Sequence, residues 1–196
     1  EQLPFSNPLS GPEPILDDAY EGPMNVSSLL TASLNPPTYP DSIKESKEVL
    51  KKMENPDWEY FRLSDVNPSV PFIQYLETQK LPFEKEALAE IIQESYPTII
   101  EQKEHFNRPR PVEVNSKIKP AKSKTADTPS YPAGHTFQSY MIAEYLSDLH
   151  PPHKRKFFAI AKRIAEARVS VGLHYPSDNK KSIDLVNTIL LEENPP

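Results

Sequence analysis

The chain has 196 residues, of which 37% are hydrophobic, and it carries a formal net charge of −6. This length suits one domain with its own core, and no stretch approaches the ~18 consecutive apolar residues of a membrane-spanning helix, so we expect a soluble protein. An acidic balance gives no support to nucleic-acid binding, which needs a basic face. The absence of cysteine excludes a thiol nucleophile, a disulfide framework and a thiolate metal site.

The N-terminal part of the chain is rich in proline and shows no sustained hydrophobic period. Such a segment favours extended backbone over helices. We therefore expect residues 1–40 to form an arm and residues 41–196 to form the folded domain. Because the first residue is Glu1 and not methionine, we also expect that an N-terminal piece has been removed or left out.

Helical patterns begin immediately after this arm. Ser42 and Glu45 have the spacing of a capping box, and apolar residues then recur at helical intervals as far as Asn55–Pro56. The pattern predicts a first helix between these points. A short helix is predicted after Pro68, and a longer one from about Glu84.

The pattern from Glu84 continues to Pro97, which either breaks the helix or begins the next one at its first turn. Residues 112–130 are polar and contain four lysines, so they predict a loop, which is either a basic flap over a site or a plain solvated loop. Three more helices are predicted, from Gly134 to the proline pair at 151–152, from His153 to Val171 and from Ser182 to Leu191. No alternating strand pattern occurs, and the predicted fold is mostly helical.

Two basic residues continue the apolar stripes of their predicted helices. Arg168 follows Phe157, Ala161 and Ile164 at spacings of four, three and four, and Lys103 lies four residues after Ile99. A buried cation needs an anionic partner. Either each cation pairs with a nearby carboxylate, or the two share an internal anion.

Two further groups of residues add the chemistry of an oxyanion site. Gly134 and His135 lie where a proline-containing turn meets a helix start, which presents free backbone N–H groups to an anion. His174 and Asp178 are four residues apart, so a helix that begins near His174 would place them on one face. A carboxylate on one ring nitrogen leaves the other nitrogen available as a nucleophile. Each pattern alone is also typical of ordinary capping or core residues.

Together these groups resemble the three-part signature of the type 2 phosphatidic acid phosphatase superfamily, which includes bacterial class A non-specific acid phosphatases and vanadium haloperoxidases. The soluble class A enzymes are the most similar branch. The parts stand here as Lys103 with Arg110–Pro111, as Pro132–Ala133–Gly134–His135, and as Arg168 with His174 and Asp178. The resemblance implies an all-α fold, a single-domain helical bundle of the acid phosphatase and haloperoxidase type with a proline-rich N-terminal arm.

Two positions depart from the signature. Ala133 replaces the serine that usually precedes the glycine, so one hydroxyl donor to phosphate is missing, and Ala167 replaces the serine that usually precedes the arginine. Both changes preserve the charged groups. We expect activity to survive them, with an effect on rate or substrate preference.

The resemblance implies a role for each matched residue. His174 would attack phosphorus with Asp178 holding its ring, and His135 would protonate the leaving alcohol and then activate water. The equatorial oxygens would be held by the side chains of Lys103, Arg110 and Arg168 and by the Gly134 N–H. The reaction would be the hydrolysis of phosphomonoesters through a phosphohistidine, and this mechanism needs no metal.

Two other functions stay open at this point. The same residues can hold vanadate, which would then be the cofactor of a haloperoxidase, and otherwise an inhibitor of the phosphatase. A phosphate-binding or phospholigand-binding pseudoenzyme is the third reading, and Ala133 favours it. The expected partner is a small phosphate ester, with no nucleic acid, and a homo-oligomer is compatible with the sequence. The resemblance favours a periplasmic or secreted protein and leaves a cytoplasmic one open.

Overall fold

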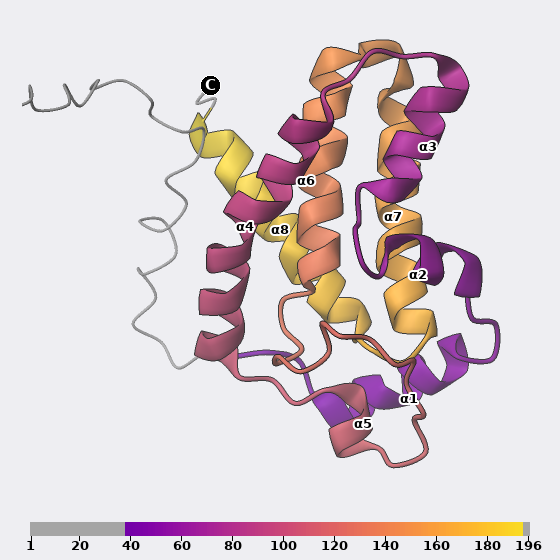
Figure 1. Cartoon of the computed structure of the whole chain (residues 1–196). Helices are drawn as coiled ribbons and strands as arrows, with labels where there is room; N and C mark the ends of the chain where they lie inside the picture. Colours follow the sequence, from indigo (N-terminus) through magenta and orange to yellow (C-terminus); the bar gives the residue numbers. More distant parts are fainter. Residues whose placement is uncertain (1–37, 194–196) are drawn as a thin grey trace, which may run out of the picture.

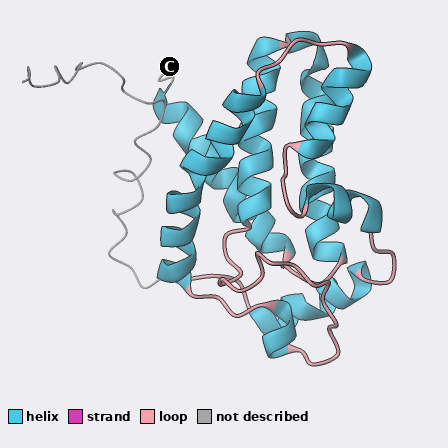
Figure 2. Ribbon diagram, viewed as in Figure 1, coloured by secondary structure: helices cyan, strands magenta, loops and turns pink. Residues whose placement is uncertain are grey.

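The computed structural model describes residues 38–193, and within this range the chain contains helices and no strand (Figure 2). The helices are α1 (Ser42–Lys52), α2 (Trp58–Ser64), α3 (Val70–Gln79), α4 (Lys85–Phe106), α5 (Pro111–Val114), α6 (Gly134–Leu149), the 3₁₀ helix η2 (Pro151–His153), α7 (Lys154–Ser170) and α8 (Pro176–Glu193). This confirms the predicted all-α class. The predicted arm at residues 1–40 lies outside the described residues, except for residues 38–40.

The centre of the fold is the antiparallel pair α6 and α7, which stand side by side in Figure 1. α4 and α8 pack against α6, and α2 and α3 pack against α7. The short helices α1 and α5 contact each other and lie across the lower end of the bundle in this view. The tight pairing of α6 with α7 follows from the short connection through η2, which a proline pair begins.

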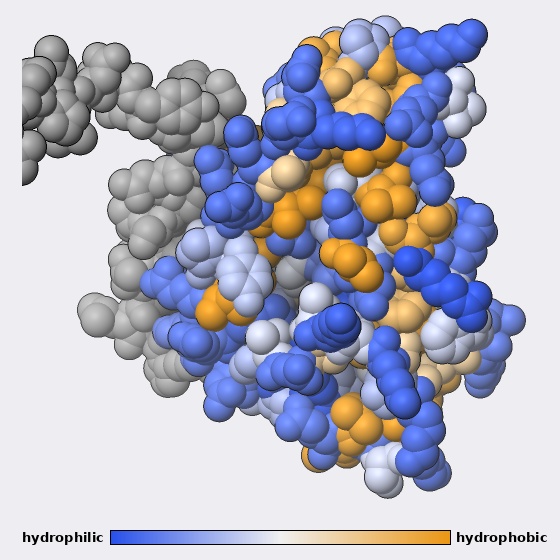
Figure 3. Space-filling view, viewed as in Figure 1, coloured by the Kyte–Doolittle hydropathy of each residue, from blue (hydrophilic) through white to orange (hydrophobic). Residues whose placement is uncertain are grey.

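The main core lies between α3, α4, α6 and α7. Its fully buried side chains include Phe72, Leu88, Leu146 and Phe157, which come from these four helices in turn. A second cluster joins α4, α6 and α8. Figure 3 shows apolar side chains gathered over the upper half of the same view and mostly hydrophilic ones over the lower end. No helix within residues 38–193 is long and apolar enough to span a bilayer.

The first helix begins as predicted, but its cap differs from the prediction. The Asp41 carboxylate caps α1 by accepting from the backbone N–H groups of Ile43 and Lys44. Ser42 and Glu45 form no capping box, because both side chains turn toward the interior and contact the guanidinium of Arg108. The sequence analysis did not predict α2, which has only seven residues and is too short to show a helical period.

Two predicted boundaries are wrong. α4 runs without interruption from Lys85 to Phe106 and contains Pro97, and Figure 1 shows a bend part-way along it. Proline removes one backbone hydrogen bond and kinks the helix. Leu88 on one side of the bend and Ile99 on the other are both buried against α6, and this packing keeps the helix continuous. α8 begins at Pro176, six residues before the predicted start at Ser182.

Candidate active site

Most of the predicted site residues lie at the ends of four helices, whereas Arg110 follows α4 and His174 precedes α8. Lys103 is in the last turn of α4, His135 in the first turn of α6, Arg168 in the last turn of α7 and Asp178 in the first turn of α8. These four ends meet at the lower end of the bundle in Figure 1, because consecutive long helices run in opposite directions. The fold therefore brings residues 75 positions apart into one cluster.

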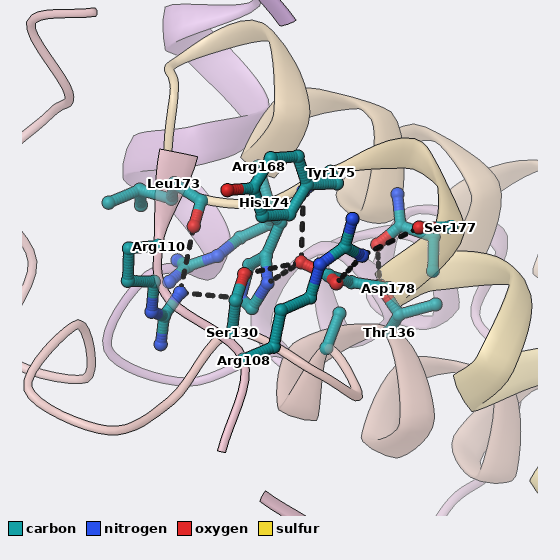
Figure 4. A network of polar contacts seen from close by, with 12 residues as sticks. Arg108, Arg110, Ser130, Thr136, Arg168, Leu173, His174, Tyr175, Ser177 and Asp178 are labelled. Carbon is teal, nitrogen blue, oxygen red and sulfur yellow. Dashed lines mark hydrogen bonds and ion pairs between the residues drawn. The ribbon is translucent and has the colours of Figure 1, made fainter. Parts of the chain in front are cut away.

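His174 and Asp178 form the predicted pair. The Nδ1 atom of His174 is 3.0 Å from Oδ2 of Asp178, and its Nε2 atom is 3.0 Å from Nη1 of Arg110 (Figure 4). A guanidinium can only donate, so Nε2 must accept, and the ring proton is on Nδ1, where it is donated to the carboxylate. The imidazole is therefore neutral, with the Nε2 lone pair directed at the cations.

Among the described residues, the side chains of Arg110 and Lys103 have only neutral hydrogen-bond partners. Arg110 donates to the carbonyl of Leu173 at 2.8 Å and to that of Thr128 at 2.8 Å, and Lys103 donates to the carbonyl of Pro129. Both side chains are almost completely buried. Neither cation has a carboxylate as its own hydrogen-bonded counterion, which leaves a local excess of positive charge in a protein that is acidic overall.

Arg168 has a carboxylate partner that the sequence analysis did not identify. Its Nη1 atom is 2.7 Å from Oδ1 of Asp65, and its Nη2 atom is 3.0 Å from the hydroxyl of Thr125. The Nε atom is buried and has no hydrogen-bond partner among the described residues. The predicted pairing of a buried cation with a carboxylate is thus confirmed for Arg168. Its unpartnered Nε donor could in addition bind an oxyanion.

His135 is held by the same residue. Its Nε2 atom is 2.8 Å from the backbone carbonyl of Asp65, which can only accept, so Nε2 carries the proton and Nδ1 has the lone pair. Burial, together with Arg168, lowers the pKa of His135 to about 3. The imidazole is neutral in the unliganded site at ordinary pH.

The charges of the site shift one another's pKa values. Burial, together with Arg110, lowers the pKa of Lys103 far below its usual value and also lowers that of His174. Burial lowers the pKa of Arg110 to about 10, and it raises the pKa of Asp178 to about 6 against the opposing pull of Arg108. An oxyanion among these cations would relieve the repulsion that the cations now exert on each other.

The start of α6 supplies backbone donors. Ala133 is the N-cap and offers no side-chain hydrogen bond, so the N–H groups at Gly134 and His135 have no capping oxygen. Their position at a helix N-terminus favours an anion. A Cβ at Gly134 would lie 3.3 Å from Ile99, so the helix start packs closely against α4.

A loop closes the site from outside. The carbonyls of Thr125, Thr128 and Pro129 accept from Arg110 or Lys103, and the Ser123 and Thr125 hydroxyls lie within 3.4 Å of Arg168 Nη2. These oxygens occupy donors that a phosphate would use. A cavity of about 470 Å³, lined by Arg110, Thr128 and Pro129, adjoins the site. Part of the predicted loop is therefore a cover over the cations, although its four lysines are exposed.

Three residues of the site went unnoticed in the sequence. Arg108 is fully buried and donates to Asp178 at 2.8 Å, Ser130 donates to the same carboxylate, and Asp65 holds Arg168 and His135. Arg108 lies between Lys103 and Arg110 of the first motif. This position was the one feature of the sequence that could have pointed to it. Asp65 and Ser130 belong to no motif. The remaining histidines make contacts elsewhere: His153 bonds the Tyr75 hydroxyl, and His150 lies 2.7 Å from the Pro82 carbonyl.

Comparison with known proteins identifies one family. The sequence model of the PAP2 superfamily matches residues 86–183, which is half of the chain and contains all seven predicted site residues. No curated protein matches the chain significantly. Asp65 and Glu45 lie before the matched segment, so part of the site is built from residues outside it.

Proposed function

The chain belongs to the PAP2 superfamily, whose members are typically phosphoester hydrolases, and on this premise we propose that it hydrolyses phosphomonoesters without a metal through a phosphohistidine at His174. The observation that carries the proposal is the orientation of the His174 ring. Asp178 fixes the proton on Nδ1, so the Nε2 lone pair faces Arg110 within a cluster of three cations. A nucleophile and the binding groups for a tetrahedral oxyanion thus lie in one cluster.

In the first step the substrate's phosphoryl oxygens replace the loop carbonyls on Lys103 and Arg110 and take the unpartnered Nε donor of Arg168. Once Arg110 turns to phosphate, the Nε2 lone pair of His174 is released and attacks phosphorus. The bond from phosphorus to the ester oxygen breaks, and that oxygen takes a proton from His135. Preorganised donors of this kind contribute about 3–4 kcal/mol each to transition-state stabilisation.

In the second step His135 accepts a proton from water, whose oxygen attacks the phosphohistidine. The P–N bond breaks, its electron pair returns to Nε2 of His174, and inorganic phosphate leaves. Asp178 stabilises the positive charge that the His174 ring carries while it is phosphorylated.

The protonation of His135 depends on the substrate. In the unliganded site its pKa of about 3 leaves it neutral, mainly because of burial and Arg168. A phosphate dianion beside it opposes both effects and raises the pKa. His135 therefore becomes protonated, and so able to act as the general acid, when substrate binds. The added proton is on Nδ1, because Nε2 already donates to the Asp65 carbonyl.

The loop replaces the hydroxyl that Ala133 lacks. Ser123 and Thr125 place their hydroxyls beside Arg168, at 3.4 and 3.0 Å from its Nη2 atom. The Ser123 hydroxyl donates its proton to Oδ1 of Asp65 at 2.6 Å, so the Thr125 hydroxyl is the one that can donate to an equatorial oxygen that Arg168 holds. The alanine substitution in the motif is thus compatible with a working phosphate site.

Within the superfamily we place the chain nearest the class A acid phosphatases. No large insertion separates the three motifs, which favours a phosphatase over a haloperoxidase. The expected substrate class is a small phosphomonoester.

The test is turnover of p-nitrophenyl phosphate by the full chain, with and without EDTA. Turnover should be unchanged by EDTA and inhibited competitively by orthovanadate in the micromolar range or below, because vanadate takes the trigonal-bipyramidal geometry of the transition state. His174→Ala should abolish turnover. His105→Ala is the matched control, since His105 lies exposed on α4 and should leave the rate unchanged.

Three results would contradict the proposal. Loss of activity on chelation, restored by a divalent cation, would indicate a metal-dependent phosphatase. Halide oxidation with vanadate and peroxide, in the absence of phosphatase turnover, would indicate a haloperoxidase. Tight phosphate binding without either activity would identify a pseudoenzyme.

A further inference from the structure

Arg108 is a fully buried arginine that the proposed reaction does not use. It follows α4, two residues before Arg110, and its side chain has no exposed surface. It sits on the far side of Asp178 from His174, so it does not face the phosphate site (Figure 4). A fully buried guanidinium is costly unless all its donors are satisfied.

All three nitrogen atoms of Arg108 have partners. Nη1 donates to Asp178 Oδ1 at 2.8 Å and to the Ser177 hydroxyl at 2.7 Å. Nη2 donates to Glu45 Oε2 at 2.7 Å and to the Pro40 carbonyl at 3.1 Å, and Nε donates to the Ser42 hydroxyl at 3.1 Å. One guanidinium therefore joins α1 to the start of α8.

Aromatic rings fix the plane of this guanidinium. Its carbon lies 3.8 Å from the ring centroid of Tyr175, and the rings of Tyr39 and Tyr131 are at 5.3 and 5.6 Å. Stacking and five hydrogen bonds leave Arg108 a single orientation.

The two oxygens of Asp178 have separate tasks. Oδ2 accepts from His174, from the Ser130 hydroxyl and from the Tyr175 N–H, while Oδ1 accepts only from Arg108 among residues 38–193. The rotation of the carboxylate, and with it the direction of the His174 ring, depends on where Oδ1 is held.

We propose that Arg108, braced by Glu45, is a positioning residue that orients the Asp178 carboxylate and thereby the His174 imidazole. The proposal rests on the proposed function, since it assumes that His174 acts as the nucleophile. It also gives α1, which lies before the segment matched by the PAP2 family, a part in the reaction.

The charges around Asp178 set the sign of the expected effects. The charged and titratable groups that face it are Lys103 in the last turn of α4, Arg108 and Arg110 in the segment after α4, Glu45 from α1, Tyr131 from the loop before α6, and His174 and Tyr175 from the turn before α8. Removing Arg108 raises the pKa of the Asp178 carboxyl above its present value of about 6, because burial is then opposed by fewer cations. Removing the charge of Glu45 lowers it, because a neighbouring anion is lost.

The first experiment compares Arg108→Met and Arg108→Lys with the wild-type chain. Arg108→Met should lower kcat on p-nitrophenyl phosphate about 10–100-fold, the usual effect of losing a group that orients a histidine. The inhibition constant for inorganic phosphate should change less than about 3-fold, because Arg108 does not contact the phosphate site. The acid limb of the kcat/KM profile should move to higher pH, and Arg108→Lys should restore part of kcat.

Glu45→Gln is the matched variant at the other end of the same guanidinium. It should move the acid limb to lower pH, opposite to Arg108→Met, and this opposite sign is not expected from a general loss of packing. If Arg108→Met does not fold, the shift of the acid limb in Glu45→Gln still tests the proposal. An acid limb that stays in place in Arg108→Met, or that moves in the same direction in both variants, would overturn the proposal.

Nitrogen NMR of histidine-labelled protein separates this proposal from the proposed function. The wild-type chain should show His174 protonated at Nδ1, with this proton donated to the Asp178 carboxylate. In Arg108→Met the tautomer should stay the same, because Arg110 still donates to Nε2, but the Nδ1 resonance should shift as the carboxylate rotates. This readout needs no turnover, so it applies even if the wild-type chain is not a phosphatase. An unchanged Nδ1 resonance in Arg108→Met would refute the positioning role.

Discussion

At the scale of single residues, the chemistry of the site is set by which ring nitrogen of each histidine carries the proton. His174 has a donor-only arginine on Nε2, and His135 has an acceptor-only carbonyl on the same atom. The two rings are therefore neutral tautomers of opposite kind. His174 presents a lone pair at Nε2 to phosphorus, and His135 keeps Nδ1 for exchange of a proton.

His135→Ala should distinguish substrates by their leaving groups. Alkyl phosphates need a proton on the departing oxygen, so their kcat/KM should fall about 10²–10⁴-fold, whereas p-nitrophenyl phosphate should lose less than about tenfold. The measurement is the ratio of kcat/KM for ethyl phosphate and p-nitrophenyl phosphate in each variant. An equal loss on both substrates would contradict the assignment of His135 as general acid.

Asp65→Asn should tighten the binding of phosphate. Asparagine keeps an oxygen for Nη1 of Arg168 but removes a negative charge beside the expected oxyanion, so the inhibition constant for phosphate should fall about 3–10-fold, by roughly 1 kcal/mol. Titration calorimetry with phosphate measures this directly. Weaker binding would mean that the carboxylate acts mainly by orienting Arg168.

At the scale of elements, the site depends on how helices end. α7 finishes in a Schellman motif, with the N–H of Leu173 bonded to the Arg168 carbonyl and the N–H of Gly172 bonded to the Val169 carbonyl. Gly172 has a φ of 80°, which lets the chain reverse within one residue. The turn places the Leu173 carbonyl on Arg110 and leads directly into His174.

Gly172→Ala should therefore destabilise the protein by about 2 kcal/mol. Its left-handed backbone is unfavourable for alanine, and the added Cβ would lie 3.0 Å from Met53 and 3.1 Å from Ile118. Urea unfolding followed by circular dichroism measures the change in the free energy of unfolding. Gly134→Ala is the comparison: its φ is not positive, so it should cost less than about 1 kcal/mol. A Gly172→Ala cost as small as this would refute the argument.

At the scale of the whole molecule, the fold buries several positively charged side chains close together. Lys103, Arg110 and Arg168 are all buried at one end of the bundle, and together with burial they hold the pKa of His174 far below its usual value. The bundle tolerates this because α4, α6, α7 and α8 pack along their remaining length. Stability and anion binding should therefore be linked.

Acid should destabilise the unliganded protein, and phosphate should oppose the loss. The pKa of His135 is about 3 when folded and about 6.5 when unfolded, so the unfolded chain binds more protons as the pH falls through this range. His174 acts in the same direction. Asp178 acts in the opposite direction, because its folded pKa of about 6 lies above the usual value of 3.8 for an aspartate, but it is one group against two.

The net effect should be a melting temperature about 10 °C lower at pH 4.5 than at pH 7, as measured by calorimetry in chloride. Phosphate at the same ionic strength should recover part of this difference. His135→Asn should reduce the pH dependence, because it removes one of the two groups. A melting temperature that is constant over this range would contradict the burial of neutral histidines.

The sequence by itself determined the helical class and the residues of the proposed phosphate site. Apolar residues at helical spacing are a local property, and the three motifs specify residue types at fixed intervals, so both could be recognised without a structure. Lys103 and Arg168 were expected to face inward because they continue apolar stripes, and both are buried. Their catalytic roles, with those of His135 and His174, stay predictions.

Only the tertiary structure decided what surrounds these residues. Asp65 reaches Arg168 across 103 positions, and Glu45 reaches Arg108 across 63, and such pairings follow from helix packing and have no local pattern. The same packing kept α4 continuous through Pro97, because buried residues on both sides outweigh one missing hydrogen bond. The local sequence thus determines which side chains the proposed phosphate site contains. The packing of the ends of α4, α6, α7 and α8 against one another determines which charged partner each of these side chains has.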